Sequence, residues 1–130
     1  MHNGQISQFG KFKRKLLASL PDDLFLFPQG HTDSEWAFAL FLSHLKNPAN
    51  MDEFTHHELK EAMLRTIHDI NRWSQEAGIE EVSEHFTLLM QPSLLNFCVT
   101  DGKSVVCTRY VSSKTDEAAS LVCGLSLIHI

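Results

Sequence analysis

The sequence predicts an α+β fold, in which helices come first and a β-hairpin follows late in the chain. Apolar residues recur at helical spacing in three segments before residue 78, and two β-branched or apolar runs flank Asp101-Gly102. The 130 residues, 43% hydrophobic and 21% charged, suit one globular domain. One hairpin cannot bury the faces of three helices, so we expect further strands, and the chain as it stands need not hold all of them.

The first helix is expected between Ile6 and Leu20. Apolar residues recur every three or four positions over this segment, and Pro21 ends the pattern. Residues 22–28 then form a short connector that we expect to be rich in turns.

The second helix is expected to begin at Thr32. Thr32 and Glu35 have the spacing of a capping box, in which each residue satisfies a backbone N–H of the other. Residues 36–42 are all apolar, which predicts a helix that is buried on several sides. This helix should end before Pro48.

A longer third helix is expected from about residue 55 to residue 77. Thr55 and Glu58 repeat the capping-box spacing, and Gly78 supplies a stop. One apolar stripe predicts an amphipathic, peripheral helix; it consists of Leu59, Met63, Ile67, Ile70 and Trp73.

The hairpin is expected from residues 94–100 and 104–111. Asp101-Gly102 between these runs is a favoured two-residue turn, because both positions tolerate a positive φ.

Composition limits the class of partner. Eleven basic against sixteen acidic residues give a net charge of −5, which argues against nucleic acid or an anionic membrane. Three cysteines suit a reducing compartment better than a disulfide scaffold. No apolar run reaches the roughly 18–20 residues that span a bilayer, and the first residues lack a secretion signal. We therefore expect a cytoplasmic chain that binds neither nucleic acid nor membrane.

Two short motifs could carry chemistry. Asn3-Gly4 is typical of a turn, but an Asn amide and a Gly N–H can also converge on an oxyanion. Asp33 fits the first turn of a capped helix, where it favours the positive end of the helix dipole. A carboxylate held there can also bind a substrate ammonium group, so both interpretations of Asp33 stay open.

Metal and thiol chemistry receive little support. The adjacent His56 and His57 point about 100° apart on a helix, and His68 lies roughly three turns from His57, so we expect no metal site and no cofactor. Cys98 and Cys107 fall in the hairpin strands, where small buried side chains are the ordinary case. A hydrolase that uses one of these thiols beside a histidine is a weaker hypothesis.

The two motifs and the hairpin together resemble a known family. The order of His2-Asn3-Gly4 and, about thirty residues later, Gly30–Glu35 before an apolar helix resembles that of class II glutamine amidotransferases. The hairpin from Asn96 to Tyr110 is similar to a narrower subgroup, the amidotransferase-like subunit of the glutathione-degrading complex of fungi. This resemblance extends to about Ala119.

The resemblance implies an N-terminal-nucleophile hydrolase, with antiparallel sheets and helices in a four-layer α/β/β/α fold. It implies that an amino-terminal cysteine attacks the γ-glutamyl amide of glutamine or glutathione, with its own α-amino group relaying the proton. Asn3 and Gly4 would donate to the oxyanion, and Asp33 would hold the substrate α-ammonium. The implied partners are this small-molecule substrate and a possible partner hydrolase subunit, and no cofactor is implied.

The sequence departs from the family in one respect. The family carries its nucleophile and a carboxylate-binding arginine motif ahead of His-Asn-Gly, whereas here no cysteine precedes Cys98. We therefore expect residues 1–120 to be the second half of the domain, inactive alone, and residues 121–130 to be a tail foreign to the family. The alternative is a non-catalytic interaction or regulatory module that docks a partner through helix 36–42.

Overall fold

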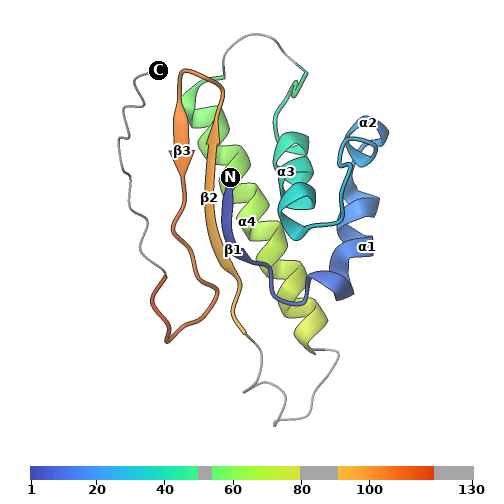
Figure 1. Cartoon of the computed structure of the whole chain (residues 1–130), viewed down its shortest axis with the longest axis vertical. Coiled ribbons are helices and arrows are strands. Elements are labelled where there is room, and N and C mark those ends of the chain that lie inside the picture. Colours follow the sequence, from blue (N-terminus) through green and yellow to red (C-terminus); the bar gives the residue numbers. More distant parts are fainter. Residues whose placement is uncertain (50–53, 80–90, 119–130) are drawn as a thin grey trace.

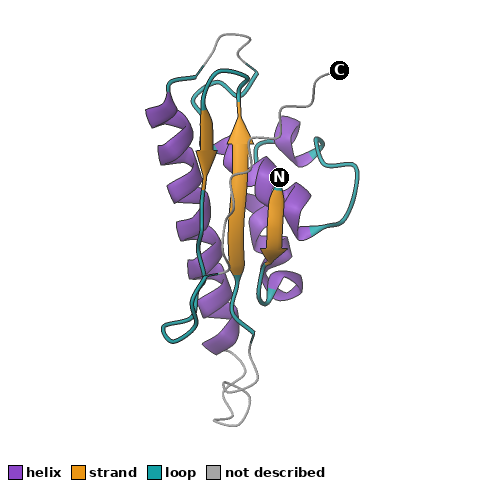
Figure 2. Cartoon of the chain, turned by 60° about the vertical axis from the view of Figure 1, so that its left-hand side comes forward, coloured by secondary structure: helices purple, strands orange, loops and turns teal. Residues whose placement is uncertain are grey.

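The computed structural model describes residues 1–49, 54–79 and 91–118, and in it helices cover one face of a small antiparallel sheet (Figures 1 and 2). The α+β class is therefore confirmed. The sheet has three strands in the order β1-β2-β3. In chain order the elements are β1 (His2–Gln5), α1 (Phe9–Ser19), α2 (Asp22–Phe25), α3 (Asp33–Ser43), α4 (His56–Ile79), β2 (Leu94–Thr100) and β3 (Val105–Cys107).

β1 is a strand that the sequence did not predict. It pairs antiparallel with β2, and Asn3 lies opposite Asn96 while Gly4 lies opposite Leu95. The expectation of a turn at Asn3-Gly4 is wrong, because pairing with a distant strand overrides the local preference of this dipeptide. β1 also supplies one of the additional strands that the helices require.

The predicted hairpin is confirmed, but the predicted two-residue turn is wrong and the second strand is shorter than expected. Thr100 pairs with Val105, so the turn has four residues, 101–104, and Gly102 has a positive φ whereas Asp101 does not. β2 spans the expected residues, whereas β3 covers only Val105–Cys107, followed by an isolated bridge between Leu94 and Val111. Asp101 closes the turn, because one of its carboxylate oxygens accepts from the backbone N–H groups of Lys103 at 3.0 Å and Ser104 at 2.7 Å. These hydrogen bonds hold the pKa of Asp101 below its usual value.

The central helix α3 begins with the predicted capping box and ends before Pro48 as expected. Five of the seven residues from 36 to 42 are buried, namely Trp36, Ala37, Ala39, Leu40 and Phe41. Phe38 is the large side chain in this segment that stays exposed, at 42%. A module that docks partners through residues 36–42 would therefore have little of this helix available.

The remaining helices agree with the sequence in type and differ in extent. α1 is shorter than the predicted segment at both ends, and residues 22–25 of the expected connector form the one-turn helix α2. α4 continues through Gly78, so the predicted stop at Gly78 is wrong. The five residues of its predicted apolar stripe are all buried.

The core lies between the sheet and α1, α3 and α4. Leu95 and Phe97 of β2 point into it, and Val99 and Val106 pack against its edge. Because side chains alternate along a strand, the residues between them lie on the opposite face, which no helix of the described chain covers (Figure 2). No helix among the described residues is long and apolar enough to cross a membrane.

Candidate functional site

Gly4 adopts a backbone conformation that other residues rarely reach. Its φ is +152°, and a Cβ added there would lie 1.9 Å from the carbonyl oxygen of Leu94. No side chain fits at that distance unless the backbone of β2 moves. Strand pairing alone therefore requires glycine at this position.

The backbone N–H of Gly4 points to the open edge of the sheet. The amino group of Met1 donates to the Cys98 carbonyl at 2.8 Å, and the Cys98 N–H donates to the Met1 carbonyl at 2.9 Å. Met1 and Cys98 are therefore a hydrogen-bonded pair, and such pairs alternate along an antiparallel ladder. The N–H groups of residues 2, 4 and 6 accordingly point away from β2. Ile6 agrees, because its N–H donates to a side chain outside the sheet.

That side chain is Asp33, the first residue of α3. Its Oδ2 accepts from the Ile6 N–H at 2.9 Å, and the Ser34 hydroxyl lies 3.3 Å from its Oδ1. The backbone nitrogens of Gly4 and Ile6 are about 7 Å apart along an extended strand. The carboxylate and the Gly4 N–H therefore occupy the same edge of β1.

A capping box fixes the chain just ahead of Asp33. The Thr32 hydroxyl accepts from the Glu35 N–H at 3.3 Å, and the Glu35 carboxylate accepts from the Thr32 hydroxyl at 2.9 Å and from the Gly30 N–H at 3.1 Å. The hydrogen bond from the Thr32 side chain is the main reason why the pKa of Glu35 lies below its usual value. This network holds the start of α3 against β1.

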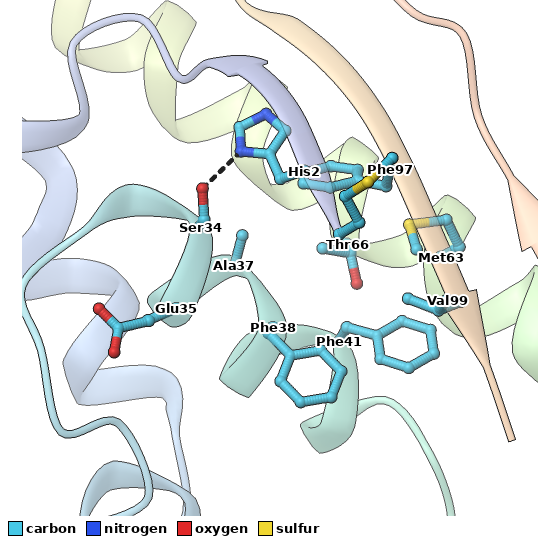
Figure 3. A pocket seen from close by; sticks show the side chains of 11 residues that line it. His2, Ser34, Glu35, Ala37, Phe38, Phe41, Met63, Thr66, Phe97 and Val99 are labelled. Carbon is cyan, nitrogen blue, oxygen red and sulfur yellow. Dashed lines mark hydrogen bonds between the residues drawn. The ribbon is translucent and has the colours of Figure 1, made fainter. Parts of the chain in front are cut away.

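Sequence reasoning gave no role to His2 and Ser34, which join β1 to α3. His2 Nε2 lies 3.0 Å from the Leu94 carbonyl, and Nδ1 lies 2.8 Å from the Ser34 hydroxyl (Figure 3). A carbonyl only accepts, so Nε2 donates to Leu94, and in the neutral imidazole Nδ1 accepts from the Ser34 hydroxyl. The imidazole also packs on the Phe97 ring, with centroids 4.5 Å apart. Their sequence positions could have indicated a role, since His2 precedes Asn3 and Ser34 follows Asp33.

Asn3 lies beside this edge on the other face of the sheet. His2 faces α3, so alternation along β1 directs the side chain of Asn3 to the face without helices, opposite Asn96. Asn3 is exposed, whereas Asn96 is buried, and the Asn96 amide oxygen accepts from the Tyr110 N–H at 3.3 Å. Two of the three predicted site residues, Asn3 and Gly4, thus belong to β1, and Asp33 lies at the open edge of this strand. The Asn3 side chain points to a different side of the strand from the Gly4 N–H and the Asp33 carboxylate.

An apolar hollow of about 200 Å³ lies on the helix-covered face (Figure 3). Its lining includes His2, Ser34, Phe38, Phe41 and Phe97, and it excludes Asn3, Gly4 and Asp33. The hollow and the predicted site are therefore different places.

The histidines among the described residues form no metal centre. The adjacent rings of His56 and His57 lie 4.1 Å apart. Within residues 1–49, 54–79 and 91–118, no group of three or more His, Cys, Asp or Glu side chains could hold a metal ion. The expectation that the chain needs no cofactor stays a prediction.

Comparison with known proteins identifies relatives of the chain. It is 50% identical over 135 residues to the probable glutamine amidotransferase DUG3 of Saccharomyces cerevisiae, an alignment that covers 98% of this chain and 36% of the yeast protein. A solved structure of a glutamine aminotransferase class-II domain protein from Silicibacter pomeroyi superposes with a TM-score of 0.62 and 26% identity, over 87% of this chain and 43% of that one. No protein-family model matches. The chain thus spans about a third of the curated relative's length.

Proposed function

We propose that this chain, which belongs to the class II glutamine amidotransferase family, forms the oxyanion-binding and ammonium-binding part of a larger hydrolase domain. The parent protein hydrolyses the γ-glutamyl amide of glutamine or of glutathione, and its nucleophile is an N-terminal cysteine. The single observation that carries the proposal is the presence of the Gly4 N–H and the Asp33 carboxylate on the same open edge of β1.

In the proposed complex the γ-glutamyl group lies along this edge. Its carbonyl oxygen accepts from the Gly4 N–H and from the Asn3 amide, and its α-ammonium group binds Asp33. From standard bond lengths, about 5 Å separate the amino nitrogen and the side-chain carbonyl carbon (Cδ) of an extended glutamyl group. The separation of about 7 Å between the Gly4 and Ile6 nitrogens leaves room for a hydrogen bond at each end.

The chemistry divides between this chain and the missing nucleophile. The cysteine sulfur adds to the side-chain carbonyl carbon (Cδ) of the γ-glutamyl group, and negative charge develops on the carbonyl oxygen that Asn3 and Gly4 face. The amide nitrogen leaves with a proton relayed by the cysteine's α-amino group, and water then hydrolyses the γ-glutamyl thioester. Loss of one oxyanion donor typically costs about 2.7–4 kcal/mol of transition-state stabilisation.

The proposal includes an incomplete domain. Residues 1–120 are the second half of a four-layer α/β/β/α domain, in which a second sheet packs on the face that no described helix covers. The alignment to about a third of the yeast protein supports this, as does the extension of β2 beyond Met1 at Val99 and Thr100, where a longer β1 could pair. Residues 121–130 are the proposed foreign tail and lie outside the described residues.

The remaining features of the proposal concern the parent protein. We place it in the cytoplasm, in glutathione catabolism, with a possible partner hydrolase subunit. The low cysteine count supports the cytoplasmic assignment, and the other two features rest on the resemblance of the hairpin to the glutathione-degrading subgroup. The yeast relative is named only as a probable glutamine amidotransferase.

The test uses the parent protein and measures glutamate release from glutamine and from glutathione. Asn3→Ala should lower kcat by about 10²–10³-fold, because an oxyanion donor acts in the transition state. Asp33→Asn should raise KM, because the substrate ammonium loses its counter-ion. Gln5→Ala is the matched control, since Gln5 is exposed on the same face as Asn3 and its side-chain amide donates to Gln91 at 2.7 Å. Unchanged kcat in Asn3→Ala would refute the proposed role of β1.

A further inference from the structure

We propose that Cys98 and Cys107 are a modification site, a dithiol that low-molecular-weight disulfides convert reversibly into a cross-strand disulfide. The two residues are directly opposite each other in the β2–β3 ladder. Their sulfur atoms lie 3.3 Å apart, with the Cys107 thiol donating to Cys98. The inference uses only β2, β3 and the turn between them, and it concerns the 130-residue chain, in which Cys107 is exposed. The second sheet proposed above would cover this face of the sheet in the parent protein.

The ladder places the two thiols in a favourable kind of pair. The Thr108 N–H donates to the Phe97 carbonyl at 2.8 Å, so these two residues are joined by the ladder's hydrogen bonds. The next pair along, Cys98 and Cys107, is therefore a pair without backbone hydrogen bonds, for which the Cα atoms lie about 4.5 Å apart. Disulfides require about 4.4–6.8 Å between Cα atoms, so the bond can form without moving the strands.

Both thiols point away from the core. Val99 and Val106, the next residues on the two strands, pack against the core cluster, so alternation sets the cysteines on the face without helices. Cys107 is exposed and Cys98 is partly buried. Cys107 is therefore the residue that a small disulfide reaches first.

The strands keep their register whether or not the sulfurs are joined. Asp101 fixes the turn by accepting from two backbone N–H groups and accepts a third hydrogen bond, from the Phe54 N–H at 3.0 Å. The turn thus holds the two thiols opposite each other before any bond forms. This prior alignment favours reaction within the chain over reaction with a second small molecule.

The reaction balances as two exchange steps. The Cys107 thiolate attacks one sulfur of glutathione disulfide, which forms a mixed disulfide and releases one glutathione thiolate. The Cys98 thiolate then attacks the Cys107 sulfur, forms the cross-strand bond and releases the second glutathione. Two electrons pass from the cysteine pair to the oxidant, and the two thiol protons end on the released glutathione molecules or in the buffer.

The test uses the whole chain with Cys123→Ser, so that only the two described thiols remain. The reduced chain is treated with glutathione disulfide, alkylated with N-ethylmaleimide, and analysed by mass spectrometry before and after digestion. We expect a loss of two hydrogen atoms, peptides linked through Cys98 and Cys107, no retained glutathione, and full reversal by dithiothreitol. A chain that keeps glutathione on either cysteine, or whose two thiols are both alkylated, overturns the proposal.

Two variants in the same background separate pairing from simple thiol reactivity. Cys107→Ser should retain one glutathione on Cys98, because no second thiol resolves the mixed disulfide. Cys107→Ser combined with Val106→Cys moves the thiol to the opposite face of β3, and it should retain glutathione without cross-linking. Circular dichroism checks that both variants have the same spectrum as the chain that carries only Cys123→Ser. Equal cross-linking from residue 106 would show that chain flexibility, and not the ladder, brings the sulfurs together, and would overturn the inference.

Discussion

Replacing single glycines by alanine separates two reasons for glycine in this chain. At Gly4 an added Cβ meets the Leu94 carbonyl oxygen at 1.9 Å, and φ is +152°. At Gly102 φ is +96°, but an added Cβ meets nothing within 4 Å. At Gly10, in α1, neither constraint applies. Gly4 therefore tests an unfavourable φ together with a steric collision, Gly102 tests an unfavourable φ alone, and Gly10 tests neither effect.

The expected changes in the free energy of unfolding follow this order. Gly10→Ala should raise it by about 0.5–1 kcal/mol, because alanine loses less backbone entropy in a helix. Gly102→Ala should lower it by about 1–3 kcal/mol, the usual cost of an unfavourable φ. Gly4→Ala should lower the free energy of unfolding by a further ~1–3 kcal/mol, because the added Cβ displaces β2. This is the usual cost of overpacking in a protein core. This loss would be a large fraction of the stability of an ordinary domain.

The assay is urea unfolding of the 130-residue chain at equilibrium, followed by circular dichroism. The urea midpoint should be highest for Gly10→Ala, followed by the unsubstituted chain, Gly102→Ala and Gly4→Ala. The dependence of the free energy of unfolding on urea concentration should be the same for all four. A Gly4→Ala midpoint equal to that of Gly102→Ala would mean that the close approach of β1 and β2 at Leu94 carries no cost. The structural reason given for Gly4 would then be wrong.

Three further predictions concern side chains that hold the elements together. Asp33→Ala should lower the free energy of unfolding by about 1.5–3 kcal/mol, because the Ile6 N–H loses a charged acceptor, whereas Asp33→Asn should lose less; equal urea midpoints for both would contradict this. The hydrogen bond from Thr32 lowers the pKa of Glu35 in the folded chain, so its stabilisation is present above the unfolded pKa of about 4.5 and is lost as the pH falls through the lower folded value. Glu35→Gln should therefore make stability less dependent on pH in acid, as urea midpoints at several pH values would reveal. Burial lowers the pKa of His44 in the folded chain, so protonation of His44 favours the unfolded chain. The free energy of unfolding should therefore fall as the pH drops below about 6.5. A His44→Gln chain that keeps this pH dependence would exclude His44 as its source.

Local signals in the sequence predicted the parts of the fold that local contacts build. The capping box needs only residues three apart, and Thr32 with Glu35 forms the predicted bonds. The same holds for Thr55 and Glu58, whose carboxylate accepts from the Thr55 N–H at 2.9 Å. The turn after β2 likewise depends on its own few residues, which placed it correctly, although it has four residues and not the predicted two. These elements could be placed because their stabilising contacts are close in sequence.

Contacts between distant residues could not be placed in this way. β1 exists because it pairs with β2, and nothing within His2–Gln5 alone favours a strand over a turn. The bond between His2 and Ser34 joins residues 32 positions apart, and neither residue type in isolation indicates a partner. The sequence therefore indicated the two motifs that contribute to the candidate site but could not give the geometry that relates them.

Asp33 illustrates why a structural role does not exclude a functional one. The Ile6 N–H occupies Oδ2 and thereby fixes the carboxylate beside β1. The Ser34 hydroxyl can also donate to Oδ1, at 3.3 Å, and because an ionised carboxylate oxygen can accept more than one hydrogen bond, Oδ1 keeps acceptor capacity for a cation. Loss of stability in Asp33 variants alone therefore cannot decide between the two roles. A parent protein with Asp33→Asn that folds normally but shows a raised KM would assign the charge to the substrate, because the fold needs only an acceptor for Ile6 whereas an ammonium group needs the negative charge.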